Sequence, residues 1–370
     1  MKKIISIVIL LLIVFSCSKD EDKIEPDNSY DRTAILTNWA NNIIVPSFIN
    51  YQAKVQTLAT DVGTFNANPN VTNLQTTRNS WLEAYKAYQY VSMYNFGKAE
   101  EVYLKESTNS YPTDISEIQA NISSGTYNLT QISKFDEQGF PALDYLINGM
   151  AASDVLILDF YNSNTSSSKY KKYLLDVTNR LKNNADLIVT DWNSGYKASY
   201  IANNGTSVTG AVNVTTNNFV KNLEKDIRTG KLGTPAGIFS AGTLLPNKVE
   251  AFYKNDVSKI LLSEAIKASQ DFFNGKYFGS NATGESLKSA LNYVNAVRNN
   301  QKLSDIINNQ FTPINIANNA LSNSFSSQVT TDNSKMLAAY DALQKNVVYT
   351  KLDMMQALNI SIDYVDGDGD

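Results

Sequence analysis

The stretch TDNSKMLAAYDALQKNVVYTKLDMMQAL, residues 331–358, indicates the fold class of the chain. Its apolar side chains recur at spacings of three, four and seven residues: Met336, Tyr340, Leu343, Val347 and Met354. In an α-helix with 3.6 residues per turn, this spacing places all of them on one face. An apolar face of this length has to be buried against another element. The stretch therefore predicts a long helix packed against other helices.

The same periodicity continues outward from this stretch, and the alternating pattern of half-buried strands is scarce from residue 31 onward. Only residues 360–364 read as a short strand. The predicted helices cover residues 31–62 (interrupted near Pro46), 72–105, 114–122, 141–161 (broken near Gly149), 167–193, 212–229, 246–274, 284–299, 302–310, 314–327 and 331–358. This pattern predicts an all-α protein of two packed helical bundles. A loop-like stretch near residues 200–210 divides it into an N-terminal bundle at 31–205 and a C-terminal bundle at 206–370.

Composition excludes several kinds of chemistry. The chain has 43% hydrophobic and 18% charged residues and a net charge of −4, and it shows no basic stripe of the kind that binds nucleic acid. It has no histidine and a single cysteine, Cys17. A histidine-dependent nucleophile, histidine-ligated zinc and an internal disulfide are therefore excluded. Any bound metal needs oxygen ligands, which favours calcium, magnesium or ferric iron.

The first residues, MKKIISIVILLLIVFSC, have the layout of an export signal, with two lysines followed by an apolar run. The run is shorter than the roughly 20 apolar residues of a membrane-spanning helix, so we interpret residues 1–16 as a signal peptide. Its ending, Val-Phe-Ser-Cys, resembles the lipobox of bacterial lipoproteins, in which the cysteine is acylated after cleavage. We therefore expect a lipid anchor on Cys17. The alternative is a stray cysteine after an ordinary signal peptide.

Residues 17–30 follow as an acidic tether that starts with Ser-Lys-Asp-Glu-Asp after Cys17. This start resembles the export signal that places some bacterial lipoproteins on the outer face of the outer membrane. We expect an outer-membrane lipoprotein displayed on the cell surface. A protein that faces the periplasm on a solvated tether is the alternative.

Two stretches contain polar residues at unusual positions. In TTRNSWLEAYKAYQYVSMYNFG, residues 76–97, Trp81, Tyr85, Tyr88 and Ser92 share one helical face, where Ser92 replaces a bulky group. Composition alone favours an aromatic core stripe here. In QGFPALDYLING, residues 138–149, Pro141 suits the first turn of a helix, and Asp144 borders the apolar face. Asp144 either caps or pairs with a neighbour, or it is the remnant of a site.

Three further acidic features have ordinary structural interpretations. Glu224 and Arg228 are four residues apart on a predicted helix, the spacing of a surface ion pair, and Glu250 follows a helix start at Pro246. The terminal VDGDGD, residues 365–370, begins like a calcium loop, but an EF-hand needs twelve residues and a final glutamate. Instead of an EF-hand we expect either a loose acidic tail or a cap on a neighbouring helix.

Together these stretches resemble the imelysin family of bacterial envelope proteins, which is named for an insulin-cleaving peptidase and linked to iron uptake. The resemblance implies a pair of packed α-helical bundles. The family motif Gly-x-His-x-x-Glu, thought to bind metal with a further glutamate from the preceding long helix, falls on Gly139, Pro141 and Asp144. The helix acid falls on Ser92. The resemblance thus interprets Ser92 and Asp144 as remains of one site.

These replacements are poor metal ligands. The side chain of Pro141 has no donor atom. Asp144 is shorter than a glutamate by one C–C bond, about 1.5 Å, whereas metal–ligand distances tolerate roughly 0.2 Å. The hydroxyl of Ser92 is a weak ligand for a hard cation. We expect no catalytic residues and no confidently assigned cofactor, with iron or calcium on oxygen ligands as the remaining candidates.

Three functions are compatible with the sequence. The first is a non-catalytic, surface-anchored binding or accessory role in iron or haem uptake, with a cleft that includes Trp81, Tyr88, Glu224 and Arg228 and with uptake components of the envelope as partners. The second is a metallopeptidase of the imelysin type, which would need a constellation of residues that the sequence does not show. The third is a purely partner-binding surface protein.

Overall fold

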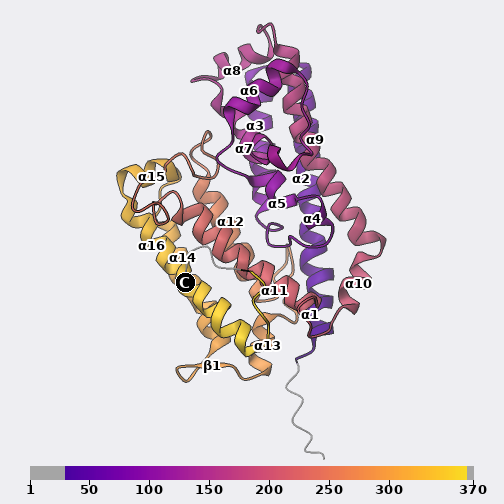
Figure 1. The fold of residues 1–370 in the computed structure, drawn as a ribbon, viewed down its shortest axis with the longest axis vertical. Helices are drawn as coiled ribbons and strands as arrows, with labels where there is room; N and C mark the ends of the chain where they lie inside the picture. The colour runs from indigo at the N-terminus through magenta and orange to yellow at the C-terminus, as the bar shows by residue number, and fades with distance from the viewer. Residues whose placement is uncertain (1–29, 365–370) are drawn as a thin grey trace, which may run out of the picture.

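The computed structural model describes residues 30–364, which form a helical protein (Figure 1). In this part of the chain the strands are β1 (Val297–Arg298) and β2 (Gln301–Lys302), which pair antiparallel. The all-α prediction is therefore confirmed. The predicted signal peptide, Cys17, the tether up to residue 29 and the VDGDGD tail lie outside the described residues.

The part of the chain up to residue 205 contains a series of helices and helical turns. In chain order they are α1 (Arg32–Asn38), η1 (Trp39–Ile44), α2 (Val45–Ala67), α3 (Val71–Tyr88), α4 (Lys98–Glu101), α5 (Leu104–Asn109), α6 (Ile115–Ser124), η2 (Ile132–Glu137), α7 (Gly139–Asp144), η3 (Tyr145–Gly149), α8 (Asp154–Tyr161), α9 (Ser167–Asp191), η4 (Trp192–Tyr196) and α10 (Lys197–Ala202). Apart from the 3₁₀-helix η2, the η elements in this part are π-helical turns.

The remaining elements follow the loop after α10. They are α11 (Ala211–Lys221), the π-helical η5 (Asn222–Gly233), α12 (Ser258–Phe273), α13 (Leu287–Tyr293), the strands β1 and β2, α14 (Leu303–Asn319), α15 (Phe325–Thr331), α16 (Asn333–Val348), the π-helical η6 (Tyr349–Met354) and α17 (Met355–Ala357). The stretch of residues 331–358 is thus helical along almost all of its length, as predicted.

The N-terminal bundle is built on the long helices α2, α3 and α9, which pack side by side (Figure 1). Asn70 caps α3, because its side chain accepts a hydrogen bond from the backbone N–H of Asn73 at 2.9 Å. The interior contains many aromatic residues among its aliphatic side chains, and Trp81 and Tyr85 are fully buried. The expected aromatic stripe of α3 is therefore a core stripe.

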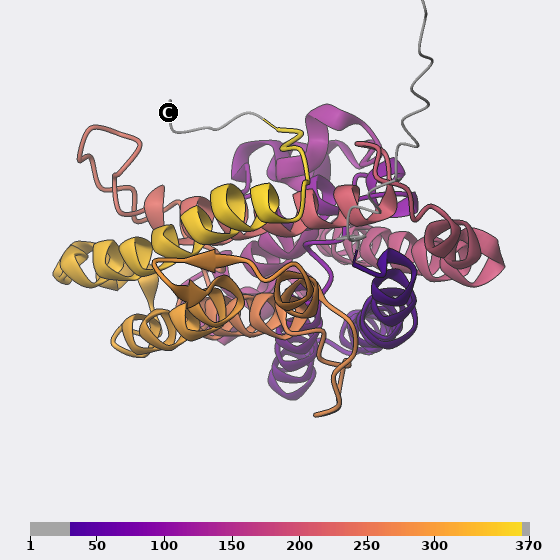
Figure 2. The ribbon, with the colours of Figure 1, turned by 90° about the horizontal axis from the view of Figure 1, so that it is seen from below.

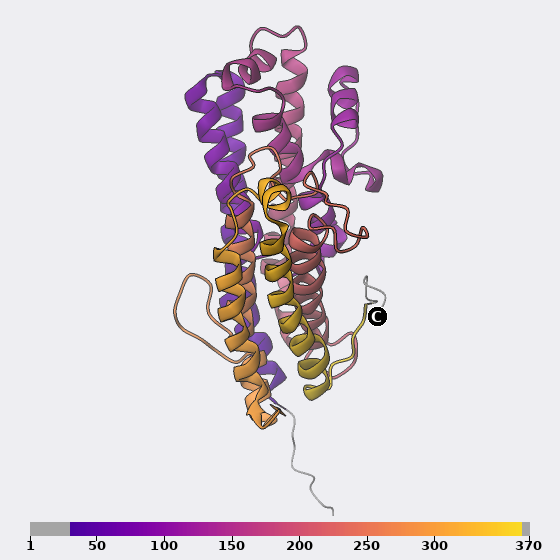
Figure 3. The same ribbon diagram turned by 90° about the vertical axis from the view of Figure 1, so that its left-hand side faces the viewer.

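The C-terminal bundle consists of η5, α12, α14 and α16, with α14 and α16 running side by side (Figure 3). A second core of its own, between Leu223 and Val347, holds these helices together. Viewed from below, the orange helices of this bundle lie beside the indigo and purple helices of the N-terminal bundle (Figure 2). The prediction of two packed helical bundles is therefore confirmed.

The larger core connects the two bundles. Trp39 of η1 and Phe272 of α12 lie with ring centroids 4.9 Å apart, and Tyr94 contacts the same Phe272 ring at 5.7 Å. The predicted boundary between residues 205 and 206 falls in the loop between α10 and α11. It stays a prediction, since this core draws on residues from both sides of it.

Two helix predictions in the N-terminal half need correction. The chain stays helical past Pro46, which lies in the first turn of α2 after the π-helical turn η1, where its missing N–H costs little. The helix predicted at 72–105 ends at Tyr88, and tight turns follow. Tyr94 and Phe96 of this segment are buried, so tertiary packing of the aromatic rings replaces the helix.

Five predictions in the C-terminal half were wrong. The helix predicted at 246–274 begins only at Ser258, and the helix predicted at 284–299 covers residues 287–293 and gives way to the β1–β2 turn. The helix predicted at 302–310 continues through Pro313 to residue 319. Pro313 is exposed, so water can hydrate the carbonyl group that lacks a hydrogen-bond donor because proline has no N–H. The helix predicted at 314–327 is replaced by a shorter one at residues 325–331. Residues 360–364 form no strand. Between residues 30 and 364, no helix combines the length and apolar character needed to cross a membrane.

Candidate functional site

The candidate site lies where α7, the loop after α5, the end of α3, η5 and the irregular segment 246–257 meet. Gly139 starts α7 with φ at 78°, a conformation that favours glycine, and a Cβ atom there would be 2.3 Å from the carbonyl oxygen of Thr108. Pro141 occupies the first turn and is buried. The predicted helix start at this motif is therefore confirmed, and the glycine is required by the close approach of α7 to α5.

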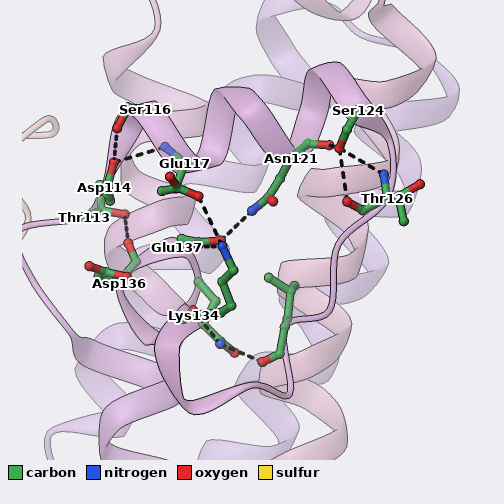
Figure 4. Close-up of polar contacts among 12 residues, drawn as sticks. Thr113, Asp114, Ser116, Glu117, Asn121, Ser124, Thr126, Lys134, Asp136 and Glu137 are labelled. Carbon is green, nitrogen blue, oxygen red and sulfur yellow. Dashed lines mark hydrogen bonds and ion pairs between the residues drawn. The ribbon is translucent and has the colours of Figure 1, made fainter.

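A buried polar cluster holds the segment that leads into α7 (Figure 4). Glu137 is 1% exposed, accepts a hydrogen bond from the side-chain amide of Asn121 and forms an ion pair with Lys134 at 2.7 Å. The hydroxyl group of Thr113 donates to the backbone carbonyl of Asp136. These bonds fix the loop at residues 110–114 beside α7.

Asp144 joins the two bundles. Its carboxylate accepts hydrogen bonds from the backbone N–H groups of Tyr253 at 2.8 Å and Lys254 at 2.9 Å, and from the side chain of Asn148 at 2.9 Å. The side chain is 1% exposed, and burial raises its pKa to about 7, although the three hydrogen bonds act in the opposite direction. Asp144 therefore pairs with a neighbour, one of the two roles that the sequence left open.

A pocket of about 350 Å³ lies next to Asp144. Its walls include Pro141, Tyr111, Val249 and Phe252, so they are largely apolar. The motif positions Gly139, Pro141 and Asp144 are thus close together, but of these side chains only that of Asp144 carries polar atoms.

Ser92 lies in a different pocket. It is in the turn after α3, and its hydroxyl group accepts a hydrogen bond from the side-chain amide of Asn222 at 3.2 Å. This second pocket, about 360 Å³, is also lined by Tyr88, while Tyr111 lines both pockets. The structure therefore does not bring Ser92 and Asp144 into one pocket.

A buried ion pair lies between the two pockets. Lys231 of η5 and Glu250 of the irregular segment are in contact, and their side chains are 5% and 2% exposed. Glu250 also accepts hydrogen bonds from the amide groups of Asn109 at 2.8 Å and Gln89 at 3.3 Å. This network crosses from α3 and α5 to the C-terminal bundle. Glu250 is therefore part of the contact between bundles, not a first-turn acid of a helix.

The other residues of the predicted cleft lie apart. Trp81 is fully buried and donates a hydrogen bond to the carbonyl oxygen of Phe140 at 3.1 Å. Glu224 and Arg228 form an ion pair at 3.6 Å, but both are about 98% buried inside the C-terminal bundle instead of on its surface. Glu224 also binds Lys351 at 2.9 Å and the hydroxyl group of Tyr364 at 2.7 Å. Of the four cleft residues, Tyr88 lines one of the two pockets.

The side chains at the motif positions do not fit a metal ion. No three acidic, histidine or cysteine residues among residues 30–364 are grouped so that they could bind one. Asp144 directs its oxygens at three N–H donors, which repel a cation, and Pro141 offers no donor atom. Ser92 lies in the other pocket. The structure therefore supplies no ligand set at this position.

Comparison with known families identifies this arrangement. The family model for imelysin, the M75 peptidase family, matches residues 44–348. This chain belongs to the imelysin family. The match covers both bundles, and it confirms the resemblance seen in GFPALDYLING and the helix before it.

Solved structures agree with the imelysin fold. A putative iron-regulated protein A precursor from Parabacteroides distasonis superposes with a TM-score of 0.71 at 14% sequence identity, over 88% of this chain and 94% of the other. An imelysin-like protein from Psychrobacter arcticum gives a TM-score of 0.67 at 16% identity, over 90% and 97% of the two chains. At such identities the likeness concerns the fold alone. No curated protein matches the chain.

Sequence reasoning missed Lys231 and Tyr111, which border the pockets of this imelysin family member. No local pattern could have found the partner of Lys231, since Glu250 was interpreted as a first-turn acid. The amides that Glu250 binds, Asn109 and Gln89, are 141 and 161 residues away in the sequence. The one local signal nearby is the sequence GKLGTPAGIFSAG at residues 230–242, whose glycines and proline are typical of a loop.

Proposed function

We propose that this imelysin family member is a non-catalytic, lipid-anchored binding or accessory protein of the cell envelope, with a role in iron or haem uptake. The observation that carries the proposal is the hydrogen bonding of the Asp144 carboxylate. Its carboxylate accepts the backbone N–H groups of Tyr253 and Lys254, so it holds the two bundles together instead of presenting oxygens to a metal. Pro141 and Ser92, at the other two ligand positions of the motif, provide no carboxylate or imidazole.

Membership of the imelysin family supports the proposed role in iron uptake. The family is linked to iron uptake, and one structural neighbour is described as an iron-regulated protein. The anchor is supported by the lipobox-like Val-Phe-Ser-Cys ending at Cys17 and by the acidic residues that follow it. Display on the cell surface is the localisation that we favour, with the periplasmic face as the alternative.

A cleavage assay tests the non-catalytic part. Detergent-solubilised mature protein is incubated with insulin and with casein, with and without a chelator, beside the Asp144→Asn variant. We expect no cleavage by either protein, because no group of acidic residues that could hold a metal ion is present among residues 30–364. Cleavage that a chelator abolishes would refute this part and would favour a metallopeptidase.

Three experiments test the remaining parts. Equilibrium dialysis against ferric iron, calcium and haem should show saturable binding of an iron-containing ligand, and failure with all three would remove the iron role. Palmitate labelling in cells should be lost in Cys17→Ser. Proteolysis of intact cells then distinguishes the two faces of the membrane, because a protein that is protected until lysis faces the periplasm.

A further inference from the structure

The pocket beside Ser92 has an unusual lining. It lies between the end of α3, the loop after α5 and η5, with a volume of about 360 Å³. Four lysines line it, whereas Asp226 is the one acidic residue of the lining. The residues that matter for its chemistry are Tyr88, Lys105, Tyr111, Lys225, Lys231 and Lys248.

Two of the four lysines have acidic partners. Lys105 forms an ion pair with Asp226 at 2.6 Å, and Lys231 pairs with the buried Glu250. The ammonium group of Lys225 lies 6.0 Å from the ring centroid of Tyr364, which is no anion. The side chain of Lys248 forms no ion pair or hydrogen bond with any residue between 30 and 364. Among residues 30–364, two of the four lysines, Lys225 and Lys248, therefore have no acidic partner, and the pocket has about two positive charges in excess.

Two tyrosine hydroxyl groups add donors to this charge. Tyr88 is 2% exposed and Tyr111 is half-buried, and neither hydroxyl group has a hydrogen-bond partner in the described part of the chain. A Cβ atom on Gly230 would lie 3.3 Å from the Tyr111 hydroxyl, which places this group against η5. Burial raises the pKa of both phenols well above their ordinary value, so both are protonated donors at neutral pH. Because both residues line the pocket, a ligand there can accept hydrogen bonds from these hydroxyl groups.

The larger pocket between α2, α3 and α12 provides a contrast. It has a volume of about 450 Å³ and also contains four lysines. There Glu83 forms ion pairs with Lys54 at 3.7 Å and Lys86 at 2.7 Å, and Asp271 pairs with the other two lysines. Every lysine of that pocket therefore has an acidic partner, whereas Lys225 and Lys248 beside Ser92 have none among residues 30–364, so lysine content alone does not explain the difference.

We propose that the pocket beside Ser92 binds a small molecule that carries at least two oxyanion groups, either carboxylates or phosphates. Lys225 and Lys248 neutralise the charge, and Tyr88 and Tyr111 donate hydrogen bonds to the oxygens. Charge-assisted bonds of this kind are the strong ones, and the volume suits a small ligand. The inference rests on the proposed binding role of the chain and names the class of ligand for it.

Isothermal titration calorimetry of the detergent-solubilised mature protein tests this with two probes, citrate and pyrophosphate, against chloride at equal ionic strength. We expect saturable binding of one probe, and the better probe tells whether carboxylate or phosphate is preferred. Affinity should decrease with added salt, because the attraction is partly screened. The variants Lys248→Gln and Tyr111→Phe should each weaken binding roughly tenfold.

Lys54→Gln is the matched control, since it removes a lysine from the larger pocket between α2, α3 and α12 and should leave the affinity unchanged. Lys248→Glu serves as a second variant, in which charge reversal should abolish binding while the thermal unfolding temperature stays near that of the parent. Absence of saturable binding by both probes overturns the proposal, as does equal weakening by Lys54→Gln. Neither result affects the cleavage assay, so the two proposals fail separately.

Discussion

Asp144 is a carboxylic acid whose protonation is coupled to folding. The unfolded chain releases this proton near pH 4, whereas burial raises the pKa of the folded state to about 7. Between these values the folded state binds more protons than the unfolded state, so the contribution of Asp144 to stability is present at low pH and is lost as pH rises toward 7. Above that range the contribution no longer changes.

We therefore expect the unfolding free energy of the parent protein to fall relative to that of Asp144→Asn as pH increases from about 5 to about 8. The expected difference is on the order of 3 kcal/mol, since about two pH units lie within the window. Urea denaturation of both proteins across this range measures it. Parallel curves for the two proteins would show that Asp144 titrates with an ordinary pKa.

The ion pair between Lys231 and Glu250 gives a second prediction at this scale. Glu250→Gln leaves a buried ammonium group without its counter-charge, and we expect a loss of about 3–5 kcal/mol of stability. Lys231→Met should cost a similar amount. The double variant should lose less than the sum of the two, because it removes both charges together.

Denaturant titration of the four proteins closes this cycle. Lys172→Gln is the control, since its pair with Asp176 is exposed and should change stability by at most about 1 kcal/mol. Additive losses in the double variant would mean that the two side chains do not interact energetically.

At the scale of single elements, the start of α7 can be tested through its glycine. Gly139→Ala introduces a Cβ atom 2.3 Å from a backbone oxygen in a residue with φ at 78°. We expect a loss of about 2 kcal/mol or more, because neither backbone segment can move freely. Gly63→Ala, inside α2 with open space around it, should instead gain up to about 1 kcal/mol. Thermal melts of both variants compare them, and equal shifts would contradict the requirement for glycine at position 139.

The elements that were predicted correctly are those whose structure is determined by residues close to them in the sequence. Residues 331–358 form a helix because their apolar spacing and helix-forming residues agree, and Gly139 with Pro141 indicated where α7 begins. The segment 246–257 has comparable apolar residues but is irregular. Ala251 and Asn255 have positive φ values, and Asp144 binds the backbone N–H groups of residues 253 and 254 from 109 and 110 positions away. Such long-range contacts cannot be read from periodicity.

Dependence on long-range contacts also limited the prediction of the site. The motif positions Gly139, Pro141 and Asp144 were found from the sequence and do lie together. The pocket beside Ser92 was missed, because it depends on which side chains of η5 and the loop after α5 meet where the two bundles pack together. The hairpin between β1 and β2 had a local signal that was overlooked: Asn299 and Asn300 both adopt positive φ, as two-residue hairpin turns require.

At the scale of the whole molecule, the bundles share apolar core as well as polar contacts. Phe272 of α12 packs against Trp39 and Tyr94 of the N-terminal half, and Asp144 and Glu250 add hydrogen bonds between the two bundles. Removing either half therefore exposes large aromatic surfaces and leaves buried polar groups without partners. Both effects destabilise the remaining half.

We therefore expect the chain to unfold in a single cooperative transition, and a fragment of residues 30–205 to lack one. Differential scanning calorimetry of the mature protein and of the fragment tests this, with the agreement of calorimetric and van't Hoff enthalpies as the criterion. The fragment should also expose apolar surface and bind a hydrophobic dye, because Trp39 and Tyr94 lose their contact with Phe272. A sharp, reversible melt of the fragment would instead establish residues 30–205 as an independent domain, and the contact between the bundles would then be an interface between domains that fold separately.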